Sequence, residues 1–336
     1  MSARSLLVAA FLTVAAAPAG AQEFVWTDDR PDAVAPLGVF GARTLPAGAL
    51  EFTALYSKMD QSGVRLGSDL IDPRILLDAH ENVPFDLTTA GYVVRAAYGL
   101  SDDLTLAGRL GFQMRDRWQF NQDEVFFELE SNGITDLELQ ALYDVYESGP
   151  YRAHLHAGLS VPTGSVTLED GVEGLREEGH LPYDMQIGAG AFGVSPGVTA
   201  QAMNENASVG AQLLATLYFL EKEDWRLGDR VDANVWGAFR LNRFFSASVR
   251  VRALAFEEID GFDPELDPNR DLGEFPFGLS GRRVDIPVGL NLYMPEGRWQ
   301  GHRGSIEFVF TAHERFEDYA WVASDWGFEV GWQKTF

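Results

Sequence analysis

Several arginines of this 336-residue chain occupy the polar positions of stretches in which polar and apolar residues alternate. Arg250 and Arg252 are two residues apart, so on an extended strand their guanidinium groups would point to the same side. Guanidinium groups bind carboxylates through paired hydrogen bonds, and rings of charge select solutes in barrel pores. The arginines in such positions are Arg95, Arg109, Arg152, Arg240, Arg250, Arg252 and Arg283.

Carboxylates share these polar positions, and the sequence leaves two interpretations open. In the first, arginines and carboxylates face each other across a water-filled lumen and orient dipolar or anionic solutes. In the second, they pair with one another and fill a narrow interior. The carboxylates concerned are Glu51, Glu138, Asp144, Asp232, Asp285, Glu307 and Glu329.

Two histidines, His154 and His156, are also two residues apart and would share a face of one strand. Such a pair binds a metal when a third ligand stands opposite. Two hydrogen-bonded histidines inside the protein are the commoner arrangement, and we expect neither a metal site nor a cofactor.

Two glycine motifs lie in sequence with no helical pattern after them. Residues 188–193 fit G-x-G-x-x-G, and residues 193–197 fit G-x-S-x-G. Both motifs carry chemistry only between a strand and a helix. Pro196 follows the serine where that helix would begin. We therefore interpret the stretch as a glycine-rich strand and expect no enzymatic activity.

The elements that must position these side chains are strands. In the last twelve residues, DWGFEVGWQKTF, the apolar residues Trp326, Phe328, Val330, Trp332 and Phe336 share one parity, interrupted only by Lys334. This alternation recurs along the chain in segments of about ten residues, long enough to cross a bilayer as tilted strands. The predicted strands are 48–57, 87–100, 103–114, 134–147, 150–161, 184–201, 207–220, 230–241, 244–256, 282–294, 303–312 and 325–336.

The connections between these strands alternate in length. Those after the even-numbered strands are short, and those after the odd-numbered strands are usually long. A soluble sandwich would also carry alternating strands. However, this asymmetry, the even number of strands and the aromatic residues at strand ends favour a membrane barrel. We predict an all-β, antiparallel, up-and-down transmembrane barrel of about twelve strands, with short periplasmic turns and long extracellular loops.

The first residues indicate export. Arg4, the apolar run 6–17 and the ending Ala19-Gly20-Ala21 are typical of a signal peptide over residues 1–21. We expect residues 22–46 to form a periplasmic lead-in, too short for a folded plug yet able to reach into the lumen. Residues 47–336 would form the barrel. The predicted location is the outer membrane of a Gram-negative cell.

The charge and composition of the chain narrow the range of partners that it can bind. The chain has 26 lysines and arginines against 50 aspartates and glutamates, a formal net charge of −24, which argues against nucleic acid. It has no cysteine, so disulfides and thiolate metal sites are excluded. The expected partners are outer-membrane lipid, lipopolysaccharide near the acidic loops 122–130, 168–179 and 257–271, the barrel-insertion machinery and a small-molecule solute.

The closing strand resembles the C-terminal signature that the insertion machinery recognises in outer-membrane barrels, and the resemblance assigns this signal to Trp332 and Phe336. The stretch GITDLELQALYDVY (133–146) with LSVPTG (159–164) resembles the core of the MetA-pathway phenol-degradation family of outer-membrane transporters. LPYDMQIGAGAFGVSPGVTA (181–200) is similar to the same family. The resemblance implies uptake or export of small aromatic compounds.

The sequence thus predicts passive diffusion of a small solute, such as an aromatic compound, through a charged lumen. The alternative is a structural or adhesive barrel whose lumen is filled by its own side chains. Twelve strands enclose a narrower lumen than that of a 16-stranded porin.

Overall fold

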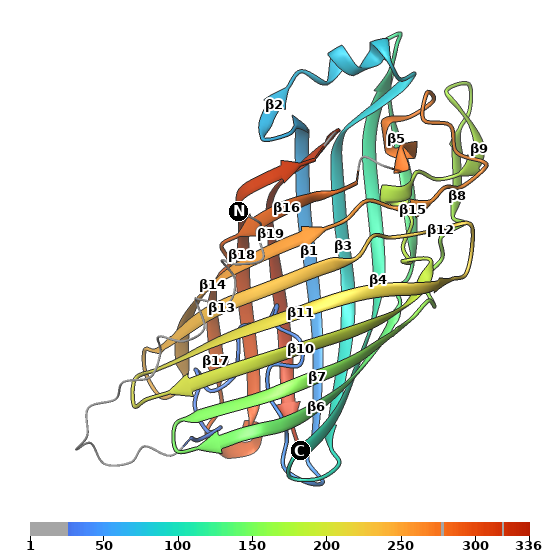
Figure 1. The fold of residues 1–336 in the computed structure, drawn as a ribbon. Coiled ribbons are helices and arrows are strands. Elements are labelled where there is room, and N and C mark those ends of the chain that lie inside the picture. Colours follow the sequence, from blue (N-terminus) through green and yellow to red (C-terminus); the bar gives the residue numbers. More distant parts are fainter. Residues whose placement is uncertain (1–25, 277–278, 318) are drawn as a thin grey trace, which may run out of the picture.

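The computed structural model describes residues 26–276, 279–317 and 319–336, and the predicted signal peptide lies outside these residues. The described chain folds into one antiparallel sheet that closes on itself (Figure 1). Closure occurs because β1 (Leu50–Leu66) pairs with β19 (Ala320–Thr335) from Glu51 to Leu66. Among the described residues there is no helix both long and apolar enough to cross a membrane.

The barrel wall has 12 strands, as the alternation predicts. Two wall strands are interrupted: β5 and β6 are separated at Thr135–Asp136, and β16 and β17 at Ile286–Pro287. Besides β1 and β19, the wall consists of β3 (Asn82–Gly99), β4 (Leu104–Asn121), β5 (Phe126–Ile134), β6 (Leu137–Ser148), β7 (Tyr151–Val161), β10 (Ala191–Met203), β11 (Ala207–Glu221), β13 (Arg230–Arg240), β14 (Phe245–Phe256), β16 (Gly281–Asp285), β17 (Val288–Tyr293) and β18 (His302–Phe316).

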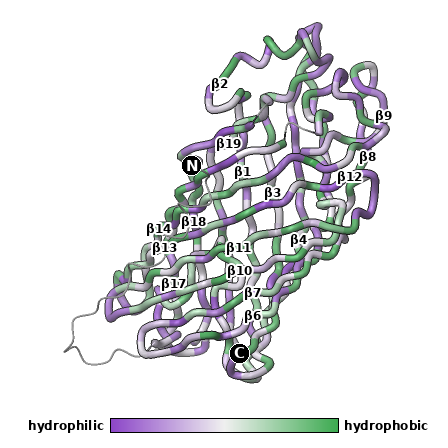
Figure 2. Tube along the Cα trace, viewed as in Figure 1, coloured by the Kyte–Doolittle hydropathy of each residue, from purple (hydrophilic) through white to green (hydrophobic). Residues whose placement is uncertain are grey.

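The two faces of the wall differ as the period of two requires. On β3, Tyr92 and Val94 point outwards and are 58% and 46% exposed, while Arg95 points into the barrel. The same alternation runs along most strands as successive green and purple positions in Figure 2. A continuous apolar outer face of this kind is the surface that a barrel presents to lipid.

Connections sort by length between the two ends of the barrel. The C-terminus and the tight turns after β3, β6, β10 and β13 lie at one end, called here the short-turn end (Figure 1). The opposite, long-loop end carries β2 (Asp69–Ile71), β8 (Glu169–Val172), β9 (Arg176–His180), β12 (Trp225–Arg226), β15 (Asp260–Gly261) and the 3₁₀ turns η3 (Pro73–Asp78), η4 (Tyr183–Met185) and η5 (Leu272–Glu274). A further 3₁₀ turn, η7 (Gly297–Trp299), lies between β17 and β18 at the short-turn end.

Some predicted boundaries are wrong. The sequence pattern places a strand at 184–201, but β10 begins only at Ala191, because residues 181–190 are buried inside the barrel as η4 and irregular chain. The predicted loop 115–133 is mostly strand, since β4 continues to Asn121 and pairs there with β5. Of the two glycine motifs, the second (193–197) lies within β10 as predicted, whereas the first (188–193) begins in irregular chain and enters the strand only at Ala191.

Candidate functional site

Residues 26–46, called here the N-terminal segment, lie inside the barrel at the short-turn end, visible as the dark blue coil in Figure 1. The segment contains no helix or strand. Side chains from strands all round the wall bind its main-chain carbonyl oxygens instead. These bonds run from Arg95 to Leu37, His154 to Gly41, Gln201 to Ala42, Ser208 to Asp32, Gln212 to Phe40, Ser246 to Pro31 and Arg303 to Arg30.

Asp28 anchors the start of this segment. Its Oδ1 accepts a hydrogen bond from Trp26 Nε1 at 2.9 Å and lies 3.6 Å from Arg43 and 3.7 Å from Arg152. Burial alone would raise the pKa of Asp28, but these neighbours outweigh it and hold the pKa below its usual value. Asp28 therefore remains ionised, and paired with the two arginines, at neutral and mildly acidic pH.

Four of the arginines singled out from the sequence form ion pairs with the predicted carboxylates. Arg250 Nε and Nη2 bind the two carboxylate oxygens of Glu307 at 3.1 and 2.9 Å, and both side chains are almost fully buried. The other pairs are Arg109–Glu138 at 2.6 Å, Arg252–Asp232 at 2.5 Å and Arg283–Asp285 at 3.1 Å. At these positions the interior is a network of paired charges.

The remaining predicted residues lie elsewhere. Arg152 stacks 4.9 Å from the Trp26 ring and pairs with Glu147, while Asp144 accepts a hydrogen bond from Thr44 at 2.7 Å. Both thus hold the N-terminal segment. Arg240 ends β13 and forms no ion pair within the described residues. Trp332 and Phe336 are exposed at 38% and 70%.

The histidine pair is satisfied by hydrogen bonds. His154 Nε2 lies 2.9 Å from the Gly41 carbonyl oxygen, and His156 Nε2 lies 2.7 Å from Thr199 Oγ1. These contacts match the arrangement that we expected to be the commoner one.

A cavity remains between the N-terminal segment and the long-loop end. It has two adjoining parts of about 430 and 340 Å³, both lined by Arg115, Gln113, Ile187 and Gly188. The smaller part is also lined by Arg95, Arg109, Arg230 and Tyr218. By contrast, two voids that lie against the N-terminal segment are much smaller, about 40 and 50 Å³. Open space in the barrel is therefore concentrated above this segment, where arginines line it.

Residues of the larger loops line the cavity towards the long-loop end and are anchored there by ion pairs. Arg117 on β4 is completely buried and binds Asp184 of η4 at 2.9 Å and Asp271 at 2.6 Å. Arg176 of β9 adds an ion pair of 2.9 Å to Glu274 of η5. Burial and the nearby Asp271 raise the pKa of Glu274. These contacts fix loop residues 162–190 and 257–276 to the barrel wall.

Asp136 holds the wall together where β5 and β6 separate. Its Oδ1 accepts a hydrogen bond from the Gly164 N–H and its Oδ2 one from the Ala189 N–H, both at 2.9 Å. Thr163 Oγ1 donates to the Thr135 carbonyl oxygen and accepts from the Leu137 N–H. A Cβ on Gly188 would lie 2.6 Å from the Gly164 oxygen, so the two backbones touch. Side chains thus replace the missing ladder bonds.

We expect Asp136→Asn to weaken this junction, because an amide offers one acceptor oxygen where the carboxylate offers two. One buried N–H would lose its partner, at a cost of about 1–3 kcal/mol. Urea titration of protein folded into lipid vesicles measures the loss. Asp144→Asn, on the same β5–β6 wall strand but with a single hydroxyl partner, is the control. Equal stability of the Asp136 variant and the natural protein would contradict this role.

The sequence interpretation did not single out Arg115, Arg230, Tyr218 or the contacts of Asp136. Asp136 and Thr163 do lie within the stretches 133–146 and 159–164 that carry the family resemblance. That resemblance was the signal in the sequence that could have pointed to Asp136 and Thr163. Arg115 was missed because strand β4 was expected to end at residue 114.

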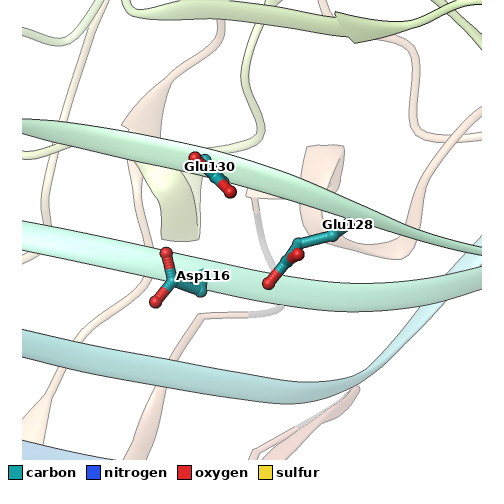
Figure 3. Close-up of side chains that lie close together, drawn as sticks. All are labelled: Asp116, Glu128 and Glu130. Carbon is teal, nitrogen blue, oxygen red and sulfur yellow. The ribbon is translucent and has the colours of Figure 1, made fainter.

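An acidic group lies on the outer face of the wall (Figure 3). Carboxylate oxygens of Asp116, Glu128 and Glu130 come within 4.8 Å of one another. Asp116 pairs with Glu130 across β4 and β5, and Trp118 pairs with Glu128. The three side chains therefore project to the same side as Trp118, away from the cavity.

No protein-family model matches the sequence, and no curated protein matches it. Solved structures do match the fold. The COG4313 outer membrane channel from Pseudomonas putida F1 aligns with a TM-score of 0.59 at 13% identity, over 89% of this chain and 100% of that chain. The transport unit of the autotransporter AIDA-I from Escherichia coli gives a TM-score of 0.49 at 10% identity, over 89% and 93%. The NanC porin gives 0.42 at 6%, over 84% and 98%.

Proposed function

We propose that this chain is an outer-membrane channel through which a small solute diffuses passively. The observation that carries the proposal is the arginine-lined cavity enclosed by a transmembrane barrel. The short-turn end then faces the periplasm and the long-loop end the exterior. Residues 1–21 direct export, and Trp332 and Phe336 serve the insertion machinery. The likeness in fold to an outer membrane channel supports this proposal.

In this channel the N-terminal segment is the inner constriction. A solute that enters between the outer loops reaches the cavity and meets guanidinium groups that replace part of its hydration shell. It leaves towards the periplasm when the segment moves aside. No reaction and no cofactor are involved, and the solute moves down its gradient.

A structural barrel with a filled lumen is the second candidate. The packing of the N-terminal segment favours it, because carbonyl groups along the whole segment are bound by the wall. The two candidates differ in a direct way. A structural barrel carries no solute under any condition, whereas a channel carries current once its constriction opens.

We expect an open channel to prefer anions. In a planar bilayer under a gradient of potassium chloride, the mature protein would show a reversal potential with the same sign as the equilibrium potential of chloride. Arg115→Glu would shift that potential towards potassium because it reverses one charge at the centre of the cavity. Arg282→Glu, at an exposed arginine paired with Glu317, is the matched control and should shift it little. Cation preference in the natural protein would count against arginine-based selection.

A further inference from the structure

On the inward face of the β3–β4 pair, arginines lie at two levels, and the paired residues between these levels are uncharged. Reading away from the short-turn end, Arg95 stands opposite Arg109, and Val93 stands opposite Gly111. Gly91 opposite Gln113 comes next, and then Thr89 opposite Arg115. The two levels are six residues apart, roughly 20 Å between their Cα atoms. Between the levels, Val93, Gly111 and Gln113 line the cavity and carry no charge.

One arginine at each level, Arg95 and Arg115, lacks a carboxylate partner within the described residues, whereas Arg109 pairs with Glu138. Arg95 donates from Nη1 to the Leu37 carbonyl oxygen at 2.9 Å, and its buried Nε has no hydrogen-bond acceptor. Arg115 donates to the main-chain oxygen of Asp184, and its Nε also has none. The Asp184 carboxylate binds Arg117 instead. Within the described residues neither Arg95 nor Arg115 forms an ion pair.

The carboxylates that line this part of the cavity are already engaged. Glu138 binds Arg109 at 2.6 Å and lies 3.8 Å from Arg230, and Asp136 accepts two main-chain N–H groups. Glu329 lines the neighbouring part of the cavity and lies outside ion-pair distance of any cation in the described chain. Four guanidinium groups thus face two occupied carboxylates across about 340 Å³.

Apolar side chains form the rest of the wall. Val93, Ile187, Leu227 and the ring of Tyr218 line the same space. A bare inorganic anion would leave these groups against water, whereas a neutral apolar molecule would leave Arg95 Nε without an acceptor. A carboxylate on a compact apolar body satisfies both.

We propose that this part of the cavity binds a small organic monocarboxylate, with its carboxylate against Arg95 and its apolar body between Val93, Ile187 and Tyr218. The polar end of a substituted ligand would reach Arg115. The inference rests on the proposed function, since it names the class of solute, but it concerns a binding site that is measurable without transport.

The test is calorimetric titration of the mature protein, folded in detergent, with cyclohexanecarboxylate. Cyclohexylmethanol has the same body without charge, and inorganic phosphate has charge without the body. We expect the carboxylate to bind at least about tenfold more tightly than either, the scale of one charge-assisted bidentate contact. Arg95→Gln should weaken it about tenfold and Arg115→Gln less. Arg243→Gln, at the exposed turn arginine paired with Glu296, should leave it unchanged.

Circular dichroism and heat-modified gel mobility would show that each variant is folded. Equal affinity for the alcohol, equal affinity for phosphate, or an Arg95→Gln variant that binds as well as the natural protein would each overturn the proposal. Planar-bilayer current separates it from the channel function. Current without Arg95-dependent binding would support the channel function and contradict the proposed binding site. Arg95-dependent binding in a protein that never conducts would support the binding site and contradict the channel function.

Discussion

Deletion of residues 26–46 is expected to raise the single-channel conductance of the inserted barrel by roughly an order of magnitude, because a lumen of twelve strands is narrow and this segment fills its short-turn half. The deleted chain keeps Leu50 to Phe336, so the β1–β19 pairing that closes the barrel is intact. Planar-bilayer recording of both proteins, refolded in the same way, measures the change.

A milder variant controls for damage to the barrel. Arg303→Gln removes two bonds to the segment, to the main-chain oxygens of Asp28 and Arg30, and leaves the strand ladder complete. We expect brief openings of the same conductance as in the deleted protein, because the segment would detach at one point. If the deletion leaves the conductance unchanged in protein shown to be inserted, the outer loops close the lumen and the segment is not its constriction.

Arg250→Ala is expected to cause the largest loss of stability, about 3–5 kcal/mol, because it leaves the Glu307 carboxylate buried without its cation. Arg250 is 3% and Glu307 2% exposed, so water reaches neither group. Glu307 would keep only its hydrogen bond from the Gly38 N–H. The measurement is the urea midpoint of folding into lipid vesicles.

The double variant Arg250→Met with Glu307→Leu separates lost charge pairing from lost packing. We expect it to recover most of the stability, because two apolar side chains of similar size avoid the buried charge. Arg252→Ala, whose partner Asp232 is partly exposed, should cost less than half as much. A double variant as unstable as Arg250→Ala would mean that the hydrogen bond to Asn234 and the contact with Gly38, and not the ion pair, stabilise this level of the barrel.

The wall of the barrel was readable from sequence because its two faces have different environments. A period of two in apolar residues is imposed wherever one face meets lipid, so residues such as Tyr92, Val94 and Trp332 mark their strands. The lengths of the connections then indicated which end of the barrel carries short turns and which carries long loops. The predicted strand 282–294 was wrong in one respect, because it is interrupted between β16 and β17 at Pro287, which lacks the N–H that a ladder needs.

The interior was not readable in the same way. Arg250 and Glu307 are 57 positions apart in the chain and lie on β14 and β18, with β17 between them. Whether they meet depends on the registers of β14 with β17 and of β17 with β18, and a periodic pattern does not fix register. Residues 181–190 alternate enough to suggest a strand, yet their side chains are buried by loops folded into the barrel. Arg95 and Arg250 look equivalent in sequence. Only the structure separates the first, without a carboxylate, from the second, with one.

The N-terminal segment has a consequence for the order of assembly. Its partners lie far along the chain: Ser246 is 215 positions from Pro31, and Arg303 is 273 positions from Arg30. Contacts of such long range form late, since the intervening chain must first be ordered. The first strand, β1, follows the segment directly and joins the last strand to complete the cylinder. The segment must therefore be inside before that seam forms, or thread in afterwards through the open end. The wall binds many of its carbonyl groups, whatever side chains those residues carry, but it also binds the side chains of Asp28, Asp29 and Thr44, so we expect sequence variation in the segment to be tolerated least at these three positions.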